Sequence, residues 1–284
     1  MSTTATPVAR DAFLELHADM SLAARNRLAI QDVRDGARLW RLAWKLGWLD
    51  IRLRYRGSVL GPFWLTLSTG IMVAALGVLY STLFKLNLHN YLPFLSLSLV
   101  LWGFLATVVS ESCGTFTDTE PVIRAMRMPF FVFAIRTALR NLLVLVHNLV
   151  VIVVVYAVLL IWPGWHALIA IPGVALWTLD ALALTLLLGA FCARFRDIQP
   201  IVNSVMQIGF FVTPVIWQPA QLGARVRYLP LSPFYDMLEV VRAPMLGTAP
   251  DAMTWLGAVG YSALLCGMAW AFFVRARGRI AFWL

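Results

Sequence analysis

The feature that most constrains this chain is a series of six long apolar runs between residues 63 and 274. Each run is about 17 to 26 residues long, which suits an α-helix that crosses a hydrocarbon core of roughly 30 Å at 1.5 Å per residue. A transmembrane β-barrel would instead show shorter segments of alternating polarity. The runs therefore predict an all-α integral membrane protein with six transmembrane helices, near residues 63–84, 94–113, 141–162, 167–192, 201–217 and 254–274.

The composition agrees with a membrane protein. Hydrophobic residues make up 61% of the 284 residues and charged residues only 13%, which is more apolar than a typical water-soluble domain. We divide the chain into a cytoplasmic N-terminal extension (1–36), an amphipathic interface helix and turn (37–60) and the six-helix transmembrane domain (61–284).

The basic residues predict the orientation. Of the 23 Lys and Arg residues, 19 fall on one side of the six expected spans. Only Lys85, Arg225, Arg227 and Arg242 fall on the other side. The positive-inside rule then places both termini of this multi-pass membrane protein in the cytoplasm. Anionic lipid headgroups account for the net charge of +9, so the charge does not call for a nucleic-acid partner.

The segment before the first span is basic and aromatic. Residues 37–56 place arginines on one helical face, leucines on a neighbouring face, and Trp40, Trp44 and Trp48 at i, i+4 and i+8. Such a helix lies flat in the headgroup region and anchors the first span. It leads into the sequence R-L-R-Y-R-G-S-V-L-G-P-F-W at residues 52–64, which we call the collar. A role in binding substrate can coexist with the role as an anchor.

Two connections between the expected spans carry structure of their own. In the turn after the second span, Asp118 is expected to cap a short helix that begins near Glu120 and ends before Pro129. An ordinary connection with positive-inside arginines is the alternative. The connection over residues 218–253 is long and apolar, and its prolines bound short helical patterns. Re-entrant helices are expected there, because non-helical backbone at membrane depth must be buried in protein or line a cavity.

The sequence shows no catalytic or metal-binding motif. It lacks G-x-x-x-x-G-K-[ST], H-E-x-x-H and G-x-S-x-G, and its three cysteines form no C-x-x-C pair. No catalytic residue, metal site or cofactor is therefore assigned to this chain. The acids expected at membrane depth are Glu111 and Asp180. We expect Asp180 to pair with an arginine or a hydroxyl of a neighbouring helix.

Five motifs together resemble the signature positions of type-2 ABC exporter permeases. They are R-Y-R-G-S-V-L-G-P-F-W (54–64), R-M-P-F-F (127–131), A-R-F-R-D-I (193–198), F-F-V-T-P-V-I-W (210–217) and L-S-P-F-Y (231–235) with Arg242 downstream. Within that superfamily the chain resembles the polysaccharide-export permeases of the O-antigen and capsule systems, the Wzm and KpsM type. This resemblance covers about residues 37–284 and leaves out the N-terminal extension.

The resemblance implies a half-transporter that exports a lipid-linked polysaccharide from the cytoplasm. Two copies would pair around a central pathway, and each would bind a separate ATPase subunit that carries ATP and Mg. In that family the turn after the second span is a coupling helix seated in a groove of the ATPase. The residues expected to contact the ATPase are Asp118, Glu120 and Arg124, with Arg194, Arg196 and Asp197 in a second turn.

The resemblance also gives the collar a ligand. Family members export glycans built on a polyprenyl pyrophosphate or another lipid carrier, and arginine matches phosphate oxygens bidentately. The residues expected to meet this headgroup are Arg52, Arg54, Tyr55 and Arg56, with backbone turns at Gly57, Leu60 and Gly61. Binding of bulk lipid phosphate by the same arginines remains the alternative.

A polysaccharide pathway needs aromatic faces that stack on the C–H surfaces of sugars. Aromatic residues near span ends also form interfacial belts, so the pathway set is chosen by position alone. The candidates are Phe63, Trp64, Trp102, Phe104, Trp177, Phe210, Phe211 and Trp217.

Two other function classes stay open. A type-2 ABC exporter of a drug, a lipid or a teichoic-acid-like polymer would share the same fold and also lack the phosphate-binding loop. An intramembrane glycosyltransferase or acyltransferase would carry acids on its outer loops. Asp236, Glu239 and Asp251 are expected on that side, but they show no acid–base or metal-ligand spacing.

Overall fold

The computed structural model describes residues 21–54, 56, 57, 61 and 63–284, and all regular elements in that part of the chain are helical. The all-α prediction is therefore confirmed. The elements in chain order are α1 (Leu22–Arg38), α2 (Trp40–Arg54), α3 (Phe63–Leu83), α4 (Leu88–Gly114), α5 (Glu120–Ala125), α6 (Phe130–Leu159), η1 (Trp165–Ile169), α7 (Ala170–Arg194), α8 (Ile198–Val212), η2 (Pro219–Leu231), α9 (Pro233–Met245), α10 (Ala252–Ala276), η3 (Arg277–Arg279) and α11 (Ile280–Trp283).

Five helical segments of the described chain are long and apolar enough to cross a membrane: α3, α4, α6, η1 with α7, and α10 with its C-terminal extension. The remaining apolar run, expected at 201–217, forms α8, which has only 15 residues. The helix stops at Val212 because Thr213 adopts an extended conformation before Pro214, as residues that precede proline commonly do.

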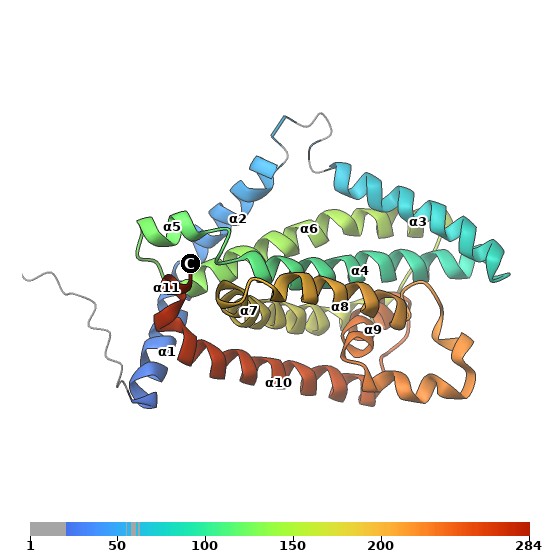
Figure 1. The fold of residues 1–284 in the computed structure, drawn as a ribbon. Helices are drawn as coiled ribbons and strands as arrows, with labels where there is room; N and C mark the ends of the chain where they lie inside the picture. The colour runs from blue at the N-terminus through green and yellow to red at the C-terminus, as the bar shows by residue number, and fades with distance from the viewer. Residues whose placement is uncertain (1–20, 55, 58–60, 62) are drawn as a thin grey trace, which may run out of the picture.

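Helix α4 forms the centre of the bundle. It packs against α3, α6, α7, α8 and α9, while α10 covers the other side of α7 (Figure 1). In the most apolar part of α4, 61% of the residues are buried, against 11% in α3. Helix α4 is thus the core helix, and α3 is a peripheral helix whose apolar side chains are exposed.

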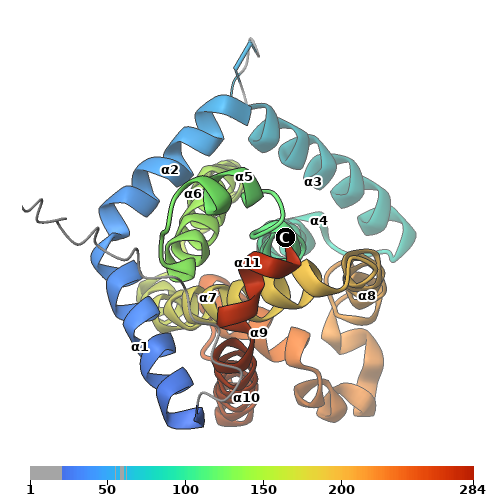
Figure 2. The same ribbon diagram turned by 60° about the vertical axis from the view of Figure 1, so that its left-hand side comes forward.

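Helices α1 and α2 lie across one end of the bundle, where α5 and the C-terminus also lie (Figures 1 and 2). We call it the basic end, because arginines of α1, α2, α6 and α7 gather there. Glycines let the two transverse helices approach α6 closely. A Cβ added to Gly36 would lie 2.7 Å from the Phe131 Cβ, and one added to Gly47 would lie 3.1 Å from the Arg136 oxygen.

Residues 37–60, expected to form an amphipathic interface helix and turn, contain the end of α1 and all of α2, which ends at Arg54, and the extension before them is helical from Leu22. Helix α1 is docked by a buried acid. Asp32 accepts hydrogen bonds from the Phe131 backbone nitrogen at 3.0 Å and from Arg277 Nε at 2.8 Å. This carboxylate joins the N-terminal segment to α6 and to the end of α10.

The short helix expected after the second span is present as α5, although its cap differs from the prediction. Thr119, and not Asp118, occupies the N-cap position, and Pro121 follows in the first turn. Glu120 and Arg124 form an ion pair at 2.9 Å. No residue of α5 is fully buried; Val122 and Ile123 are half-buried and pack against the core, whereas Arg124 is exposed.

At the opposite end of the bundle, α9 folds back against the core, and η2 packs against α9 and α10. Asp236 and Leu238 on α9 are fully buried. Helix α9 packs against α4, α7 and α10. In the adjoining bundle core, Ser262 of α10 donates a hydrogen bond to Asp180 Oδ2 of α7 at 2.8 Å. The expectation that Asp180 pairs with a hydroxyl of a neighbouring helix is confirmed.

Arg242 joins α9 to the rest of the bundle. Its side chain is fully buried and donates hydrogen bonds to Ser98 Oγ at 2.8 Å and to the Pro214 oxygen at 2.5 Å. It also pairs with Glu239, and its guanidinium lies 4.5 Å from the centre of the Phe94 ring. One cation therefore ties together α9, α4 and the segment that follows α8.

Replacing Arg242 with Met should destabilise the fold strongly. The substitution leaves Glu239 without its cation and the Pro214 oxygen without its donor, and removing one member of a buried ion pair costs about 3–5 kcal/mol. Thermal unfolding of the detergent-solubilised protein measures the effect. Arg227→Met is the matched control, because Arg227 is exposed and bonds only the neighbouring Tyr228 among the contacts described for it. Equal stability of the two variants would contradict the assigned role of Arg242.

Candidate functional site

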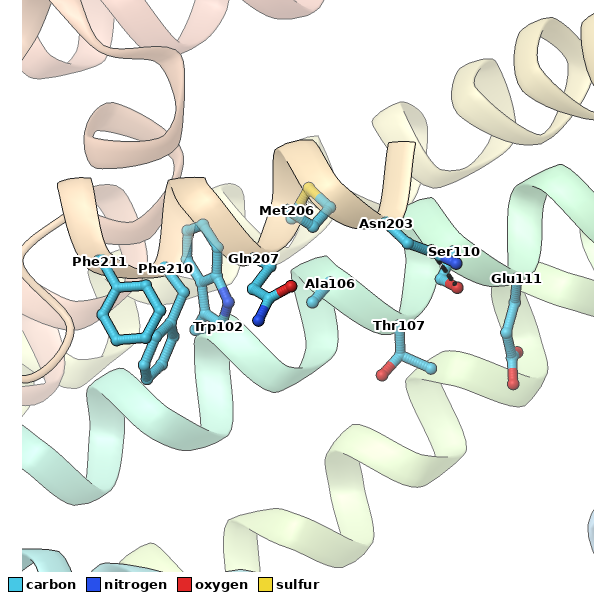
Figure 3. Close-up of a pocket in the computed structure, with 10 residues that line it drawn as sticks. All are labelled: Trp102, Ala106, Thr107, Ser110, Glu111, Asn203, Met206, Gln207, Phe210 and Phe211. Carbon is cyan, nitrogen blue, oxygen red and sulfur yellow. Dashed lines mark hydrogen bonds between the residues drawn. The ribbon is translucent and has the colours of Figure 1, made fainter. Parts of the chain in front are cut away.

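A groove of about 600 Å³ lies between α4 and α8 (Figure 3). Gly209 of α8 permits the close approach of the two helices, since a Cβ there would lie 3.1 Å from Trp102 Cη2. A hydrogen bond of 2.9 Å from Ser110 Oγ to Asn203 Oδ1 joins them again further along. The lining residues are Trp102, Ala106, Thr107, Ser110 and Glu111 of α4 and Asn203, Met206, Gln207, Phe210 and Phe211 of α8.

The chemical character of the groove changes along its length. Trp102, Phe210 and Phe211 gather at one end, and Glu111 lies at the other, toward the basic end of the bundle (Figure 3). Hydroxyl and amide groups line the part between them. The groove therefore offers aromatic faces to apolar surfaces and hydrogen-bonding groups to hydroxyls, which suits an elongated ligand that carries both.

The structure brings together three of the eight aromatic residues chosen from the sequence. Trp102, Phe210 and Phe211 line the groove, and the Trp102 and Phe210 ring centres are 6.0 Å apart. Trp217 lies close by, because its Nε1 donates a hydrogen bond to the Phe211 oxygen at 3.1 Å.

The other four aromatic candidates lie elsewhere. Phe104 and Trp177 are buried in the core, where their rings stack with centres 5.3 Å apart. Phe63 and Trp64 are exposed at the start of α3. These four residues do not line the groove between α4 and α8.

A cluster of five charged residues lies at the groove's polar end, and we call it the charged cluster: Asp50 and Arg54 of α2, Glu111 of α4, and Arg136 and Arg140 of α6. Arg136 Nε donates to Asp50 Oδ2 at 2.6 Å. Arg140 bridges the two acids, with Nη1 3.3 Å from Asp50 Oδ2 and Nη2 2.7 Å from Glu111 Oε2. Three guanidinium groups thus meet two carboxylates, which leaves one positive charge in excess.

The collar residues occupy the approach to this cluster. Arg54 Nη2 lies 2.9 Å from Glu111 Oε1, and the exposed Arg52 lies over the Trp48 ring at 5.6 Å. Arg56 and Gly57 form an exposed turn. Gly57 and Gly61 adopt φ values of +88° and +55°, which glycine tolerates without a Cβ clash. The candidates Tyr55 and Leu60 lie outside the described residues.

The two turns expected to contact an ATPase open onto one cavity of about 330 Å³ at the basic end. Glu120 lines it from the α4–α5 side and Arg196 from the α7–α8 turn. The C-terminal residue Leu284 completes the wall. Arg194 and Asp197 are exposed at the α7–α8 turn, and the side chain of Arg124 on α5 is 61% exposed. The exposed Asp118 does not line this cavity; it lines a smaller one beside Arg136 and Arg140.

Sequence reasoning missed most of the charged cluster and all of the polar groove wall. The sequence marks Arg136 and Arg140 only as positive-inside residues, although their i, i+4 spacing places both on one helical face. Nothing in the sequence distinguishes Asp50, and Glu111 stands out only as a costly acid at membrane depth. The hydroxyls and amides of the groove wall carry no motif, so no sequence signal identifies them.

Comparisons with known proteins agree with this architecture. The chain is 27% identical over 236 residues to the O-antigen export system permease protein RfbA of Myxococcus xanthus, covering 82% of this chain and 91% of the relative. It is 21% identical over 188 residues to the protein of the same name from Klebsiella pneumoniae, covering 64% of this chain and 73% of that relative. Residues 41–246 match the ABC-2 type transporter membrane family. The chain therefore belongs to the ABC-2 type transporter family and is a permease subunit, not an enzyme.

Proposed function

We propose that this protein is the permease subunit of an exporter that moves a lipid-linked polysaccharide of the O-antigen or capsule type across the bacterial inner membrane. The groove between α4 and α8 carries the proposal. It runs from a net-positive charged cluster, through hydroxyl and amide groups, to an aromatic end. The names of the two relatives, both O-antigen export permeases, support the same substrate class.

In the proposed topology, α8 is the fifth of six spans and the basic end faces the cytoplasm. The positive-inside rule supports this orientation, because most arginines lie at that end. Helices α1 and α2 then lie at the headgroup level. The exposed Trp40, Trp44 and Trp48 of α2 suit that depth, where indole rings are enriched. Helices η2 and α9 occupy the periplasmic half as re-entrant segments.

A second copy of the chain would complete the pathway. The groove is open on one side, and both α8 and α3 expose apolar side chains, among them Ile208, Phe211 and Ile71. Two grooves facing each other across a twofold axis would enclose a chain of sugars. The bulky aromatic rings would then contact the apolar faces of the sugars while Gln207 and Thr107 bind their hydroxyls.

Energy would come from two separate ATPase subunits at the basic end. The sequence has no phosphate-binding loop of its own, and ATP with Mg would bind to the partner subunits. Helix α5 suits a coupling contact because it projects outward and carries exposed charges. The turn at Arg194, Arg196 and Asp197 would form the second contact beside it.

The collar would receive the lipid carrier. Arg52 and Arg56 are exposed at the end of α2, at the depth where a phosphate headgroup lies in the proposed topology. Guanidinium groups bind phosphate oxygens in pairs. The excess positive charge of the neighbouring cluster adds to the attraction for a lipid-linked pyrophosphate.

Filling the groove should block export and leave the complex assembled. Ala106→Trp places an indole among the groove residues, and we expect export to fall at least about tenfold, equivalent to about 1.4 kcal/mol in the barrier. Surface glycan and intracellular lipid-linked glycan are measured in cells that carry the variant. Val153→Trp is the control, because Val153 lies on α6 with 65% of its surface exposed. Normal export by Ala106→Trp would argue against the groove as the pathway.

Reversing a charge on α5 should weaken the contact with the ATPase. Glu120→Lys replaces an ion pair with a repulsion toward Arg124, and we expect about fivefold weaker binding of the ATPase subunit, equivalent to roughly 1 kcal/mol. Co-purification and ATP hydrolysis of the complex report the change. Asp35→Lys on α1 is the matched control for Glu120→Lys, since it also breaks an exposed ion pair, the one between Asp35 and Arg38. If both variants retain equal ATPase binding, α5 is not the coupling contact.

A further inference from the structure

Asp236 of α9 is a fully buried acid near the end of the bundle opposite the basic end, which we call the outer end. Among the described residues, neither of its carboxyl oxygens has a hydrogen-bond partner. We propose that Asp236 is a proton-binding site: with the proton bound, the first turn of α9 docks against α10, and loss of the proton releases this turn. The consequence for transport, opening of the groove at its aromatic end, rests on the proposed function.

The carboxyl group of Asp236 lies directly against the backbone of α10. A Cβ added to Gly257 would overlap Asp236 Oδ2, so glycine at this position gives the carboxyl group its space. An ionised carboxylate that is buried without donors bears the full cost of its lost hydration, whereas a neutral carboxyl group bears only the smaller cost of a polar group. The docked position of the first turn therefore favours the protonated form of Asp236.

The charges on α9 itself also favour the protonated form. Glu239, one turn later, repels a negative charge on Asp236. The one cation of α9, Arg242, gives hydrogen bonds to Glu239, Ser98 and the Pro214 oxygen. The dipole of α9 favours an anion in its first turn, but this effect is small beside the desolvation of a buried carboxylate.

The elements that pack against α9 bring no described partner to Asp236. Asp180 of α7 accepts a hydrogen bond from Ser262 of α10. Helix α4 contributes Ser98 and Phe94, and both contact Arg242. The exposed titratable groups on η1, η2 and the start of α10 are His166, Arg225, Arg227 and Asp251.

The two halves of α9 are held with different strength. Arg242 anchors the C-terminal half to α4 and to the segment after α8. The first turn is held by two hydrogen bonds to backbone oxygens, from Tyr261 to Leu231 at 2.8 Å and from Trp177 to Met237 at 2.8 Å. Neutral hydrogen bonds of this kind contribute less than an uncompensated buried charge costs. Ionisation of the acid should therefore release the first turn while the C-terminal half stays anchored.

Phe234 connects the first turn of α9 to the groove. It lies two residues before Asp236, which places it about 200° away around the helix. Its ring centre is 5.6 Å from that of Trp102, and a Cβ added to Gly209 of α8 would lie 3.5 Å from Phe234 Cε2. Movement of the first turn would withdraw Phe234 from both walls of the groove at its aromatic end.

The proton passes between Asp236 and water. When the turn is released, the O–H bond of the carboxyl group breaks, the proton goes to a water molecule at the outer end, and the carboxylate becomes hydrated. Binding of a proton reverses the step and lets the neutral acid return to its buried position. The docked form should therefore dominate at low pH, and the released form should increase as the pH rises.

The proton site is tested by distance measurements on the full complex of permease and ATPase in phosphatidylcholine nanodiscs. Spin labels are attached at the exposed positions Leu231→Cys and Met268→Cys, in a protein whose three native cysteines are replaced by alanine. Singly labelled proteins identify distances between two copies. The ratio of long to short distances should rise at least about tenfold from about pH 5 to about pH 9, and by no more than about tenfold per pH unit, the limit for one proton.

Variants separate Asp236 from other titrating groups. Asp236→Asn has no proton to lose, so it should keep the short distance at every pH. Asp236→Leu should do the same with an apolar side chain that needs no hydrogen-bond partner, and it serves if the asparagine variant fails to fold. Asp251→Asn is the matched control, because Asp251 is an exposed acid at the start of α10 and its loss should leave the wild-type pH response unchanged.

Three results would overturn the proton site: wild-type distances that do not change with pH, a folded Asp236 variant that keeps the wild-type response, or an Asp251→Asn variant that loses it. Glycan export by cells that carry the unlabelled wild-type complex is measured in parallel. Export with distances that do not change with pH refutes the proton site alone. Distances that change with pH in a protein that exports no glycan refute the proposed substrate and leave the proton site standing.

Discussion

The pairing of two acids with the arginines of α6 is the interaction on which the basic end depends. Asp50 and Glu111 come from α2 and α4, and Arg140 bonds both of them. A partly buried charge at the edge of a membrane is tolerated only when it is paired and hydrogen-bonded. The same bonds that satisfy these acids also hold the transverse helix against the bundle, so the docking of α2 and the shape of the groove's polar end share one cause.

Much of the fold could be predicted from hydropathy, and α1 shows why the rest could not. The apolar runs of the long helices contain enough consecutive apolar residues to identify each of these helices as a membrane span. The buried face of α1 consists of Ala29, Asp32 and Gly36, which are small or charged residues without an apolar stripe. Its docking depends on a buried carboxylate and on close backbone approach. Hydropathy records neither of these, so the helix could not be separated from the rest of the N-terminal extension.

The sequence predicts where along the chain the candidate site lies better than it predicts which residues form it. Trp102 and Phe104 are two residues apart, which places them about 200° apart around a helix. Trp102 therefore faces α8 and the groove, whereas Phe104 faces Trp177 in the core. By their position in the sequence alone, Trp102 and Phe104 are equally good candidates for the polysaccharide pathway. The charged cluster required three segments, from α2, α4 and α6, to meet in space, and the sequence showed only that each segment carries charge.

The short helix α8 connects the fold to the groove. Its 15 residues span only about 22 Å at 1.5 Å per residue, so non-helical backbone must complete the crossing in the proposed six-span arrangement. Such backbone needs hydrogen-bond donors from the protein. Arg242 supplies one to the Pro214 oxygen and Tyr91 supplies one to the Ile216 oxygen, each at 2.5 Å. Trp217, at the end of this segment, donates back to the Phe211 oxygen. Because the buried arginine fixes the backbone that continues α8, it also fixes the aromatic end of the groove.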